Sequence, residues 1–179
     1  MDRCVDCGLC ERVCDFVREH PSLDTAGLEV DVLAARNRCD ATVRESQSGG
    51  AFTALSDVVL SSGGTVYGAV MKDDFTVGHM RAVTTEERNR MRGSKYVQSD
   101  MGDIFRQVRE DLSQGRTVLF AGTPCQVAGL ASYVPAGLKK NLLLLDFVCH
   151  GVPSPAIWKD YVDYMSRKGK LQQVCFRDK

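Results

Sequence analysis

Four cysteines lie close together near the beginning of the sequence: Cys4, Cys7, Cys10 and Cys14. Two residues separate each of the first three thiols, and three residues precede the fourth, which is the spacing of ferredoxin-type [4Fe–4S] ligands. Two intervening residues let the backbone curl so that successive sulfurs reach different irons, and Gly8 offers a position for positive φ. Zinc is the main alternative, because Cys-x-x-Cys pairs also bind it. The run predicts an iron–sulfur centre and therefore electron transfer.

The fourth ligand of this centre stays open. In two-cluster ferredoxins the last cysteine of such a run serves the other cluster, and a proline usually follows it. Here Asp15 follows Cys14, and the sequence has no second run. Cys14, Cys39 and a thiol from a missing segment or a partner are the three candidates.

Composition favours a single ordinary core. The chain has 179 residues, of which 44% are hydrophobic, and 23 basic residues balance 23 acidic ones. The absence of net charge gives no indication of binding to nucleic acid or an anionic membrane. No apolar run is long enough to span a bilayer, and no apolar leader follows Met1. Eight cysteines without an export signal are typical of reduced thiols and metal ligands, so we expect a cytoplasmic protein.

The chain is expected to form two parts, a ferredoxin-like cluster module over residues 1–28 and an α/β domain over residues 29–179. Residues 30–35 predict a short strand, and residues 37–47 predict a polar loop. A helix should then begin near residue 51 and end at the glycine pair 63–64.

The next segment predicts a β-hairpin. Residues 65–71 and 76–83 flank a polar turn, and the second run alternates in polarity, which places His79 on a solvent-facing side. Thr84 and Glu87 have the spacing of a capping box, which predicts a short charged helix.

The second half alternates helical and strand patterns. A helix is expected over 101–112, and short apolar runs predict buried strands at 117–121 and 142–148. Between them, Thr123 and Pro124 are typical of a helix N-cap and first position.

A further helix is expected after Ser154. Its core stripe is predicted from this set: Ile157, Trp158, Tyr161 and Met165. Residues 171–176 predict a third strand. This order implies a mainly parallel, right-handed α/β sheet with one hairpin.

Ligands of parallel sheets bind beyond the carboxyl ends of the strands. Gly122-Thr123-Pro124-Cys125 and Cys149-His150-Gly151 both leave a predicted strand at that end, so we expect them to face one pocket. Cys125 would lie in a helical first turn, which favours a thiolate, although a small buried core residue is the alternative. His150 would contact flavin or substrate. Cys125 and His150 are the catalytic candidates.

Two other loops are candidates for phosphate binding. Ser48-Gly49-Gly50 feeds a helix N-terminus and exposes backbone N–H groups, although a simple turn fits equally well. The motif Arg92-Gly93-Ser94-Lys95-Tyr96 has the chemistry to clamp a phosphate or stack an aromatic ring, and a solvated loop is its alternative.

Taken together, these motifs resemble the beta-subunit family of the deazaflavin (coenzyme F-420) hydrogenases and dehydrogenases. The resemblance extends to Gly122–Leu130, Cys149–Pro155 and the terminal Phe176–Lys179. It implies an iron–sulfur flavoprotein oxidoreductase that passes electrons between FAD and a [4Fe–4S] cluster. The implied cofactor contacts are Ser48, Gly49, Gly50, Gly93, Ser94, Lys95, Tyr96, Gly122, Thr123, Pro124, Gln126 and Cys149.

The resemblance also implies redox partners: the deazaflavin, ferredoxin or a similar protein, and other subunits of a larger assembly. Family members commonly run to about twice this length, so a truncated member is expected. The alternatives are a non-catalytic electron-relay subunit and a zinc-stapled α/β binding module.

Overall fold

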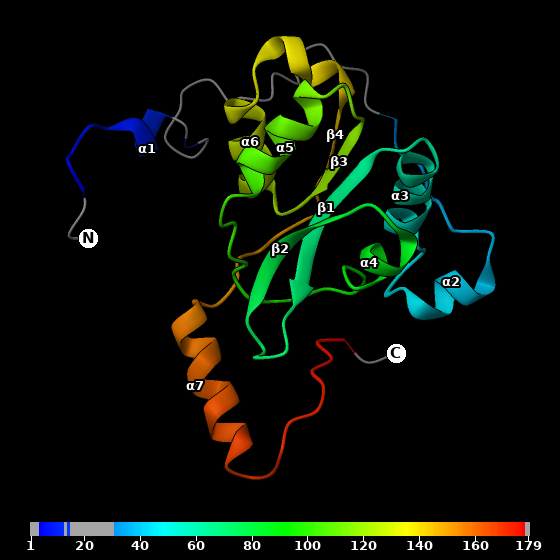
Figure 1. The fold of residues 1–179 in the computed structure, drawn as a ribbon. Helices are drawn as coiled ribbons and strands as arrows, with labels where there is room; N and C mark the ends of the chain where they lie inside the picture. The colour runs from blue at the N-terminus through cyan, green and yellow to red at the C-terminus, as the bar shows by residue number, and fades with distance from the viewer. Residues whose placement is uncertain (1–3, 13, 15–30, 178–179) are drawn as a thin grey trace.

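The computed structural model describes residues 4–12, 14 and 31–177, which include a four-stranded sheet covered by helices (Figure 1). The strands are β1 (Thr65–Met71), β2 (Val77–Ala82), β3 (Val118–Ala121) and β4 (Leu142–Leu145). Their spatial order is β2-β1-β3-β4. β1 is antiparallel to β2 and parallel to β3, and β3 is parallel to β4. The predicted α/β class, with a mainly parallel sheet and one hairpin, is confirmed.

The helices largely follow their capping signals. They are α1 (Leu9–Arg12), α2 (Asp40–Glu45), α3 (Ala51–Ser61), α4 (Thr85–Asn89), α5 (Ile104–Ser113), α6 (Pro124–Tyr133), the 3₁₀ helix η1 (Ala136–Asn141) and α7 (Pro155–Ser166). Thr84 caps α4 in a reciprocal box with Glu87, and Thr123 caps α6 with Pro124 in its first turn, as predicted. No helix in the described residues is long and apolar enough to cross a membrane.

Neighbouring strand residues pack against opposite helical layers. Val66 of β1 and Leu119 of β3 pack with Val59 of α3 on one face of the sheet. Tyr67 and Phe120, each one position further along, pack with α5 and α6 on the other face. The period of two along a strand produces this division, and Figure 1 shows α3 and α4 on one side and α5 and α6 on the other.

Two expectations before α3 are wrong. Residues 31–35 form no strand, and the side chains of Val32 and Leu33 are exposed. A strand needs a ladder partner, and these residues instead lead to a turn in which Asn37 N donates to Gly49 O at 2.7 Å. The predicted loop 37–47 contains the short helix α2.

Three expectations after α6 also need correction. β4 ends at Leu145, and as an edge strand it is only partly buried. In α7 only Trp158 is buried, whereas Ile157 is 64% exposed and Tyr161 53% exposed, so the core stripe is wrong. Residues 171–176 are not a strand. They run back toward the hairpin, where Val174 and Phe176 pack around Trp158 (Figure 1).

Much of the predicted cluster module, residues 1–28, lies outside the described residues. Within the described part, Asp6 has φ +52° and Gly8 has φ +67°. Arg12 N donates to Gly8 O at 3.1 Å, and Cys14 N donates to Glu11 O at 3.3 Å. The backbone therefore curls at Gly8 as expected from its position between the thiols. The boundary between the two predicted parts remains a prediction.

Candidate functional site

An open pocket of about 570 Å³ lies beside the turn of the β1–β2 hairpin, where four segments distant in sequence meet. The segments are residues 45–47, 71–75, 90–95 and 171–176. We call it the hairpin pocket. It brings together parts of motifs that the sequence analysis treated separately: the loop before Ser48, the Gly93–Lys95 segment and the end of the described chain.

Positive charge predominates around the hairpin pocket. The four cationic side chains in its walls are Lys72, Arg90, Arg92 and Lys95, and the two acidic ones are Glu45 and Asp73. Four minus two leaves an excess of two positive charges. A concave site with this imbalance favours an anionic ligand, because its walls focus the field into the hollow.

Lys95 combines a structural role with this charge. Its Nζ donates to Ala69 O at 2.9 Å, to Met91 O at 2.8 Å and to Arg92 O at 3.0 Å. Burial lowers the pKa of Lys95 to about 8. The Lys95 ammonium thus holds the loop after α4 against β1. The motif Arg92–Tyr96, predicted to bind phosphate, is therefore attached to the sheet through Lys95.

Two buried polar atoms of the hairpin pocket have no hydrogen-bond partner among the described residues, Gln47 Oε1 and Arg92 Nε. The Arg92 guanidinium makes an ion pair with Glu45 through Nη1. A Cβ on Gly93 would lie 3.6 Å from Gln47 Nε2, so the two loops touch here. A buried donor or acceptor without a partner costs about 1–3 kcal/mol, and a ligand that satisfies it recovers this energy.

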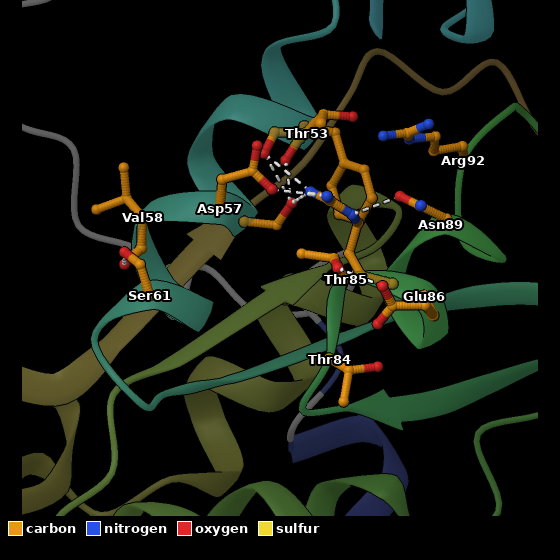
Figure 2. A network of polar contacts seen from close by, with 12 residues as sticks. Thr53, Asp57, Val58, Ser61, Thr84, Thr85, Glu86, Asn89 and Arg92 are labelled. Carbon is orange, nitrogen blue, oxygen red and sulfur yellow. Dashed lines mark hydrogen bonds and ion pairs between the residues drawn. The ribbon is translucent and has the colours of Figure 1, made fainter.

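A buried arginine fixes the position of the loop that contains Arg92. Arg88 of α4 is 2% exposed and donates to Thr53 O at 2.9 Å, to Ser56 Oγ and to Asp57 Oδ1 at 2.6 Å. Figure 2 shows Thr53 and Asp57 of α3 and Asn89 of α4 around this guanidinium. Because α3 and α4 are locked together, the loops that precede α3 and follow α4 keep a fixed relation.

The predicted glycine loops are occupied by the protein's own atoms. A Cβ on Gly49 would lie 2.6 Å from Ala35 O, and one on Gly122 would lie 3.0 Å from both Gln126 Oε1 and a Phe120 ring carbon. Gly50 has φ +78° at the N-cap of α3. These glycines permit close packing of the chain on itself. Their role as FAD contacts, together with that of Ser48, stays a prediction.

The loops after β3 and β4 lie on adjacent parallel strands, as expected. Cys125 is exposed, and its Sγ lies 3.2 Å from Thr123 Oγ1. Gly151 N donates to Cys149 Sγ at 3.4 Å, and His150 is exposed. A second hollow lies between β2 and the start of α5. Cys125, Cys149 and His150 line neither this hollow nor the hairpin pocket. The shared pocket beyond the strands stays a prediction.

The expectation that His79 faces solvent is wrong, because this histidine is half-buried behind the segment that precedes α5. Its Nδ1 lies 2.7 Å from Ser99 Oγ, its Nε2 lies 3.2 Å from Ala121 O, and its ring stacks on Phe120. Gln126 Nε2 donates to Ser99 Oγ at 3.0 Å. Burial lowers the pKa of His79, which favours the neutral ring.

Gln47 and Arg90 line the pocket although no sequence motif indicated them, and Arg92 was not among the predicted cofactor contacts. Arg92 is the first residue of the motif Arg92-Gly93-Ser94-Lys95-Tyr96, so the sequence could have indicated it as a contact. Gln47 precedes Ser48-Gly49-Gly50 directly, but its side chain meets Gly93, which is 46 positions away (93 − 47), and no local pattern reveals that contact.

The thiols of the cysteine run are described only in part. Cys4 and Cys7 are exposed and Cys14 is half-buried. In the portion of the chain that is described, no three His, Cys, Asp or Glu side chains gather closely enough to hold a metal ion. The donors fit an iron–sulfur cluster in type and spacing, and their exposure leaves the sulfurs accessible to one.

Comparisons with known proteins agree with this architecture. Residues 115–178 match the family model for the C terminus of the coenzyme F420 hydrogenase/dehydrogenase beta subunit. A chain from a structure of the F420-reducing [NiFe] hydrogenase complex of Methanosarcina barkeri is 21% identical, with a TM-score of 0.57. The match covers 72% of this chain and 47% of that chain, so this sequence spans about half of its neighbour's length. No curated protein sequence matches.

The structural match shows that the chain has an α/β fold similar to that of one chain in an F420-reducing hydrogenase complex. The resemblance inferred from the motifs is confirmed by the family model over residues 115–178, which include β3, α6, β4 and α7.

Proposed function

We propose that this chain belongs to an iron–sulfur flavoprotein that passes electrons between FAD and a [4Fe–4S] cluster. The observation that carries the proposal is the run Cys4, Cys7, Cys10 and Cys14 in a chain with an F420 hydrogenase beta-subunit match. When bound, the two cofactors supply the exchange between electron pairs and single electrons. The protein supplies ligands, orientation and charge.

The cysteine run would hold the cluster. The left-handed turns at Asp6 and Gly8 support this assignment, because they redirect the backbone between the first and third thiols. Cys14 is the fourth candidate ligand, and Cys39 is an alternative. Backbone and side-chain hydrogen bonds from Thr42 lower the pKa of the Cys39 thiol, which would favour the thiolate that iron requires.

The hairpin pocket would hold the flavin cofactor. Three of the contacts expected from the family resemblance, Gly93, Ser94 and Lys95, lie in its wall, and Tyr96 packs edge-on against Phe176 at 5.7 Å. The excess of cationic side chains suits the pyrophosphate of FAD. The catalytic roles of Cys125 and His150 remain part of the proposal, at the loops beyond β3 and β4.

The redox partner would be the deazaflavin coenzyme, ferredoxin or another subunit. Support comes from the structural neighbour, which belongs to a hydrogenase complex. The exposed side chains of Ile157, Tyr161 and Tyr164 on α7 favour the second candidate, an electron-relay subunit that works inside a larger assembly. Turnover of reduced deazaflavin by the isolated chain would support the enzyme, and turnover only after addition of partners would support the relay.

Anaerobic reconstitution tests the cluster directly. We expect about four irons per chain and a broad visible absorption that dithionite bleaches, which zinc cannot produce. Cys7→Ser should remove most of the iron. Cys175→Ser is the matched control, because Cys175 is also exposed but lies outside the run. Equal iron content in the two variants would refute the assignment.

A further inference from the structure

One corner of the hairpin pocket, formed by Gln47, Arg92, Gly93 and Ser94, has the polar groups of a specific ligand site. We propose, on the basis of the function proposed above, that this corner binds a phosphate group and the adjoining polyhydroxylated chain of the flavin-type cofactor. Arg92 and the two backbone N–H groups would hold the phosphate, and Gln47 would accept a hydrogen bond from a hydroxyl next to it.

The guanidinium of Arg92 presents one unused edge. Its side-chain hydrogen bond within the described residues runs from Nη1 to Glu45, and its buried Nε has no acceptor. The edge formed by Nε and Nη2 is the planar fork that fits two oxygens of a phosphate. The side chain is 15% exposed and lines the hairpin pocket, so part of it is within reach of a ligand there.

The backbone after Arg92 adds donors. Gly93 has φ +80°, and both Gly93 and Ser94 are exposed. Within the described part of the chain, the N–H groups of residues 93–95 donate no hydrogen bond. Consecutive unbonded N–H groups around a left-handed residue form a concave anion site. Gly93 and Ser94 line the same pocket as Arg92.

Gln47 determines what must adjoin the phosphate. Its buried Oε1 is an acceptor without a donor in the described structure, and a phosphate has no hydrogen to offer it. A ribityl hydroxyl next to the phosphate does. Both FAD and the deazaflavin coenzyme contain a ribityl chain esterified to a phosphate group, so either is a source of the shared chemistry.

Neighbouring charge supports a phosphate group in this corner. Arg90 makes no ion pair with any described residue, and Lys72 lines the same hollow. These cations would increase the local concentration of a polyanion without fixing its orientation. Orientation would come from the Arg92 fork and the Gln47 acceptor.

The experiment measures binding to the complete 179-residue chain of FAD, the intact deazaflavin, riboflavin and inorganic pyrophosphate. Arg92→Gln should lower the affinity for phosphate-bearing ligands at least ~10-fold, because it removes one pair of charge-assisted hydrogen bonds. The affinity for riboflavin should stay unchanged. Arg92→Lys should weaken them nearly as much, because it keeps the charge and loses the fork. Arg106→Gln is the matched control, since it removes an exposed arginine that pairs with Asp103 and lies outside the pocket, and should stay within about twofold of wild type.

Gln47→Leu tests the second contact. It should weaken FAD or the deazaflavin several-fold and leave pyrophosphate binding unchanged, because pyrophosphate has no hydroxyl for Oε1. Circular dichroism of each variant verifies the fold. The ligand that shows both the Arg92 and the Gln47 dependence identifies the source of the phosphate.

The outcomes separate this inference from the proposed function. Pyrophosphate binding that depends on Arg92, with no flavin binding, would refute the flavoprotein function and retain the phosphate site. Flavin binding that is unchanged in both Arg92 variants, or reduced equally for FAD and riboflavin, would overturn the phosphate site and retain the flavoprotein function.

Discussion

Replacing Arg88 with methionine should separate α4 from α3 and loosen the hairpin pocket. Methionine fills a similar volume but donates no hydrogen bond, so the acceptors on α3, Thr53 O, Ser56 Oγ and Asp57 Oδ1, lose their donor. The arginine is 2% exposed, and water cannot replace it at the first two acceptors without opening the interface.

The magnitude follows from the burial of each partner. Breaking a fully buried ion pair costs about 3–5 kcal/mol. Asp57 is 50% exposed and recovers hydration, which places the expected loss at the lower limit, about 3 kcal/mol. For a chain of this length that corresponds to a fall in Tm of about 6–12 °C.

Urea unfolding followed by far-UV circular dichroism measures this loss. Asn89→Ala is the matched control, because exposed Asn89 accepts only one bond from Arg88, at 3.1 Å, and its removal should cost about 1 kcal/mol or less. Arg88→Met should also weaken the hairpin pocket's ligand, since the Arg92 loop follows α4. If the two variants lose the same small amount of stability, the buried network does not hold the helices together.

Two further predictions concern the sheet. Burial lowers the pKa of His79 below 6.5, so the unfolded chain binds more protons between that lowered value and 6.5. The free energy of unfolding should fall as the pH drops through this window and level off below it, and His79→Gln should flatten the slope in urea titrations; an unchanged slope would contradict the assignment. Tyr67→Phe should lower the free energy of unfolding by about 1.5–3 kcal/mol, because the buried hydroxyl donates to the Asp111 carboxylate at 2.7 Å. A loss below about 0.5 kcal/mol in thermal or urea unfolding would refute this role.

Elements with local end signals could be predicted from the sequence. Thr84 with Glu87, Thr123 with Pro124, and Ser154 each mark a helix start that the structure confirms. In these cases the capping side chain and its backbone partner lie within three residues, so the information is local. The same holds for the hairpin, whose polar turn separates two strand-like runs.

Errors occurred where distant segments decide the environment. The alternating polarity of β2 placed His79 toward solvent, but His79 N donates to Asp100 O, and the segment around Ser99 covers that face. The apolar pattern of α7 and of residues 171–176 predicted core and strand. There the sheet provides no ladder partner, and Ile157 remains exposed.

The sequence indicated which residue types form part of the candidate site, but not which distant segments meet there. The Arg92–Tyr96 motif contained the cations and glycine of a phosphate site, and its neighbours in sequence indicated that chemistry. That it meets Gln47 and residues 171–176 depends on the docking of α4 on α3 through Arg88, a contact between residues more than thirty positions apart.

The pairing of β1 with β3 has a consequence for the order of folding. The hairpin partners Met71 and Val77 are six residues apart (77 − 71), and β3 and β4 pair at a separation of 24 residues (142 − 118). β1 and β3 pair across 53 residues (118 − 65) through only three register positions. Closing the longer loop carries the larger entropic cost, so each local unit should form before the two join.

The seam between these units lies at the start of the family match, residue 115, just before β3. The hairpin forms in microseconds, whereas the non-local parallel pairing is intrinsically slower and leaves two unpaired strand edges until it completes. Until β1 pairs with β3, their free edges could instead pair with strands of another folding chain. The rate at which these three register positions pair therefore determines how long the two edges stay exposed.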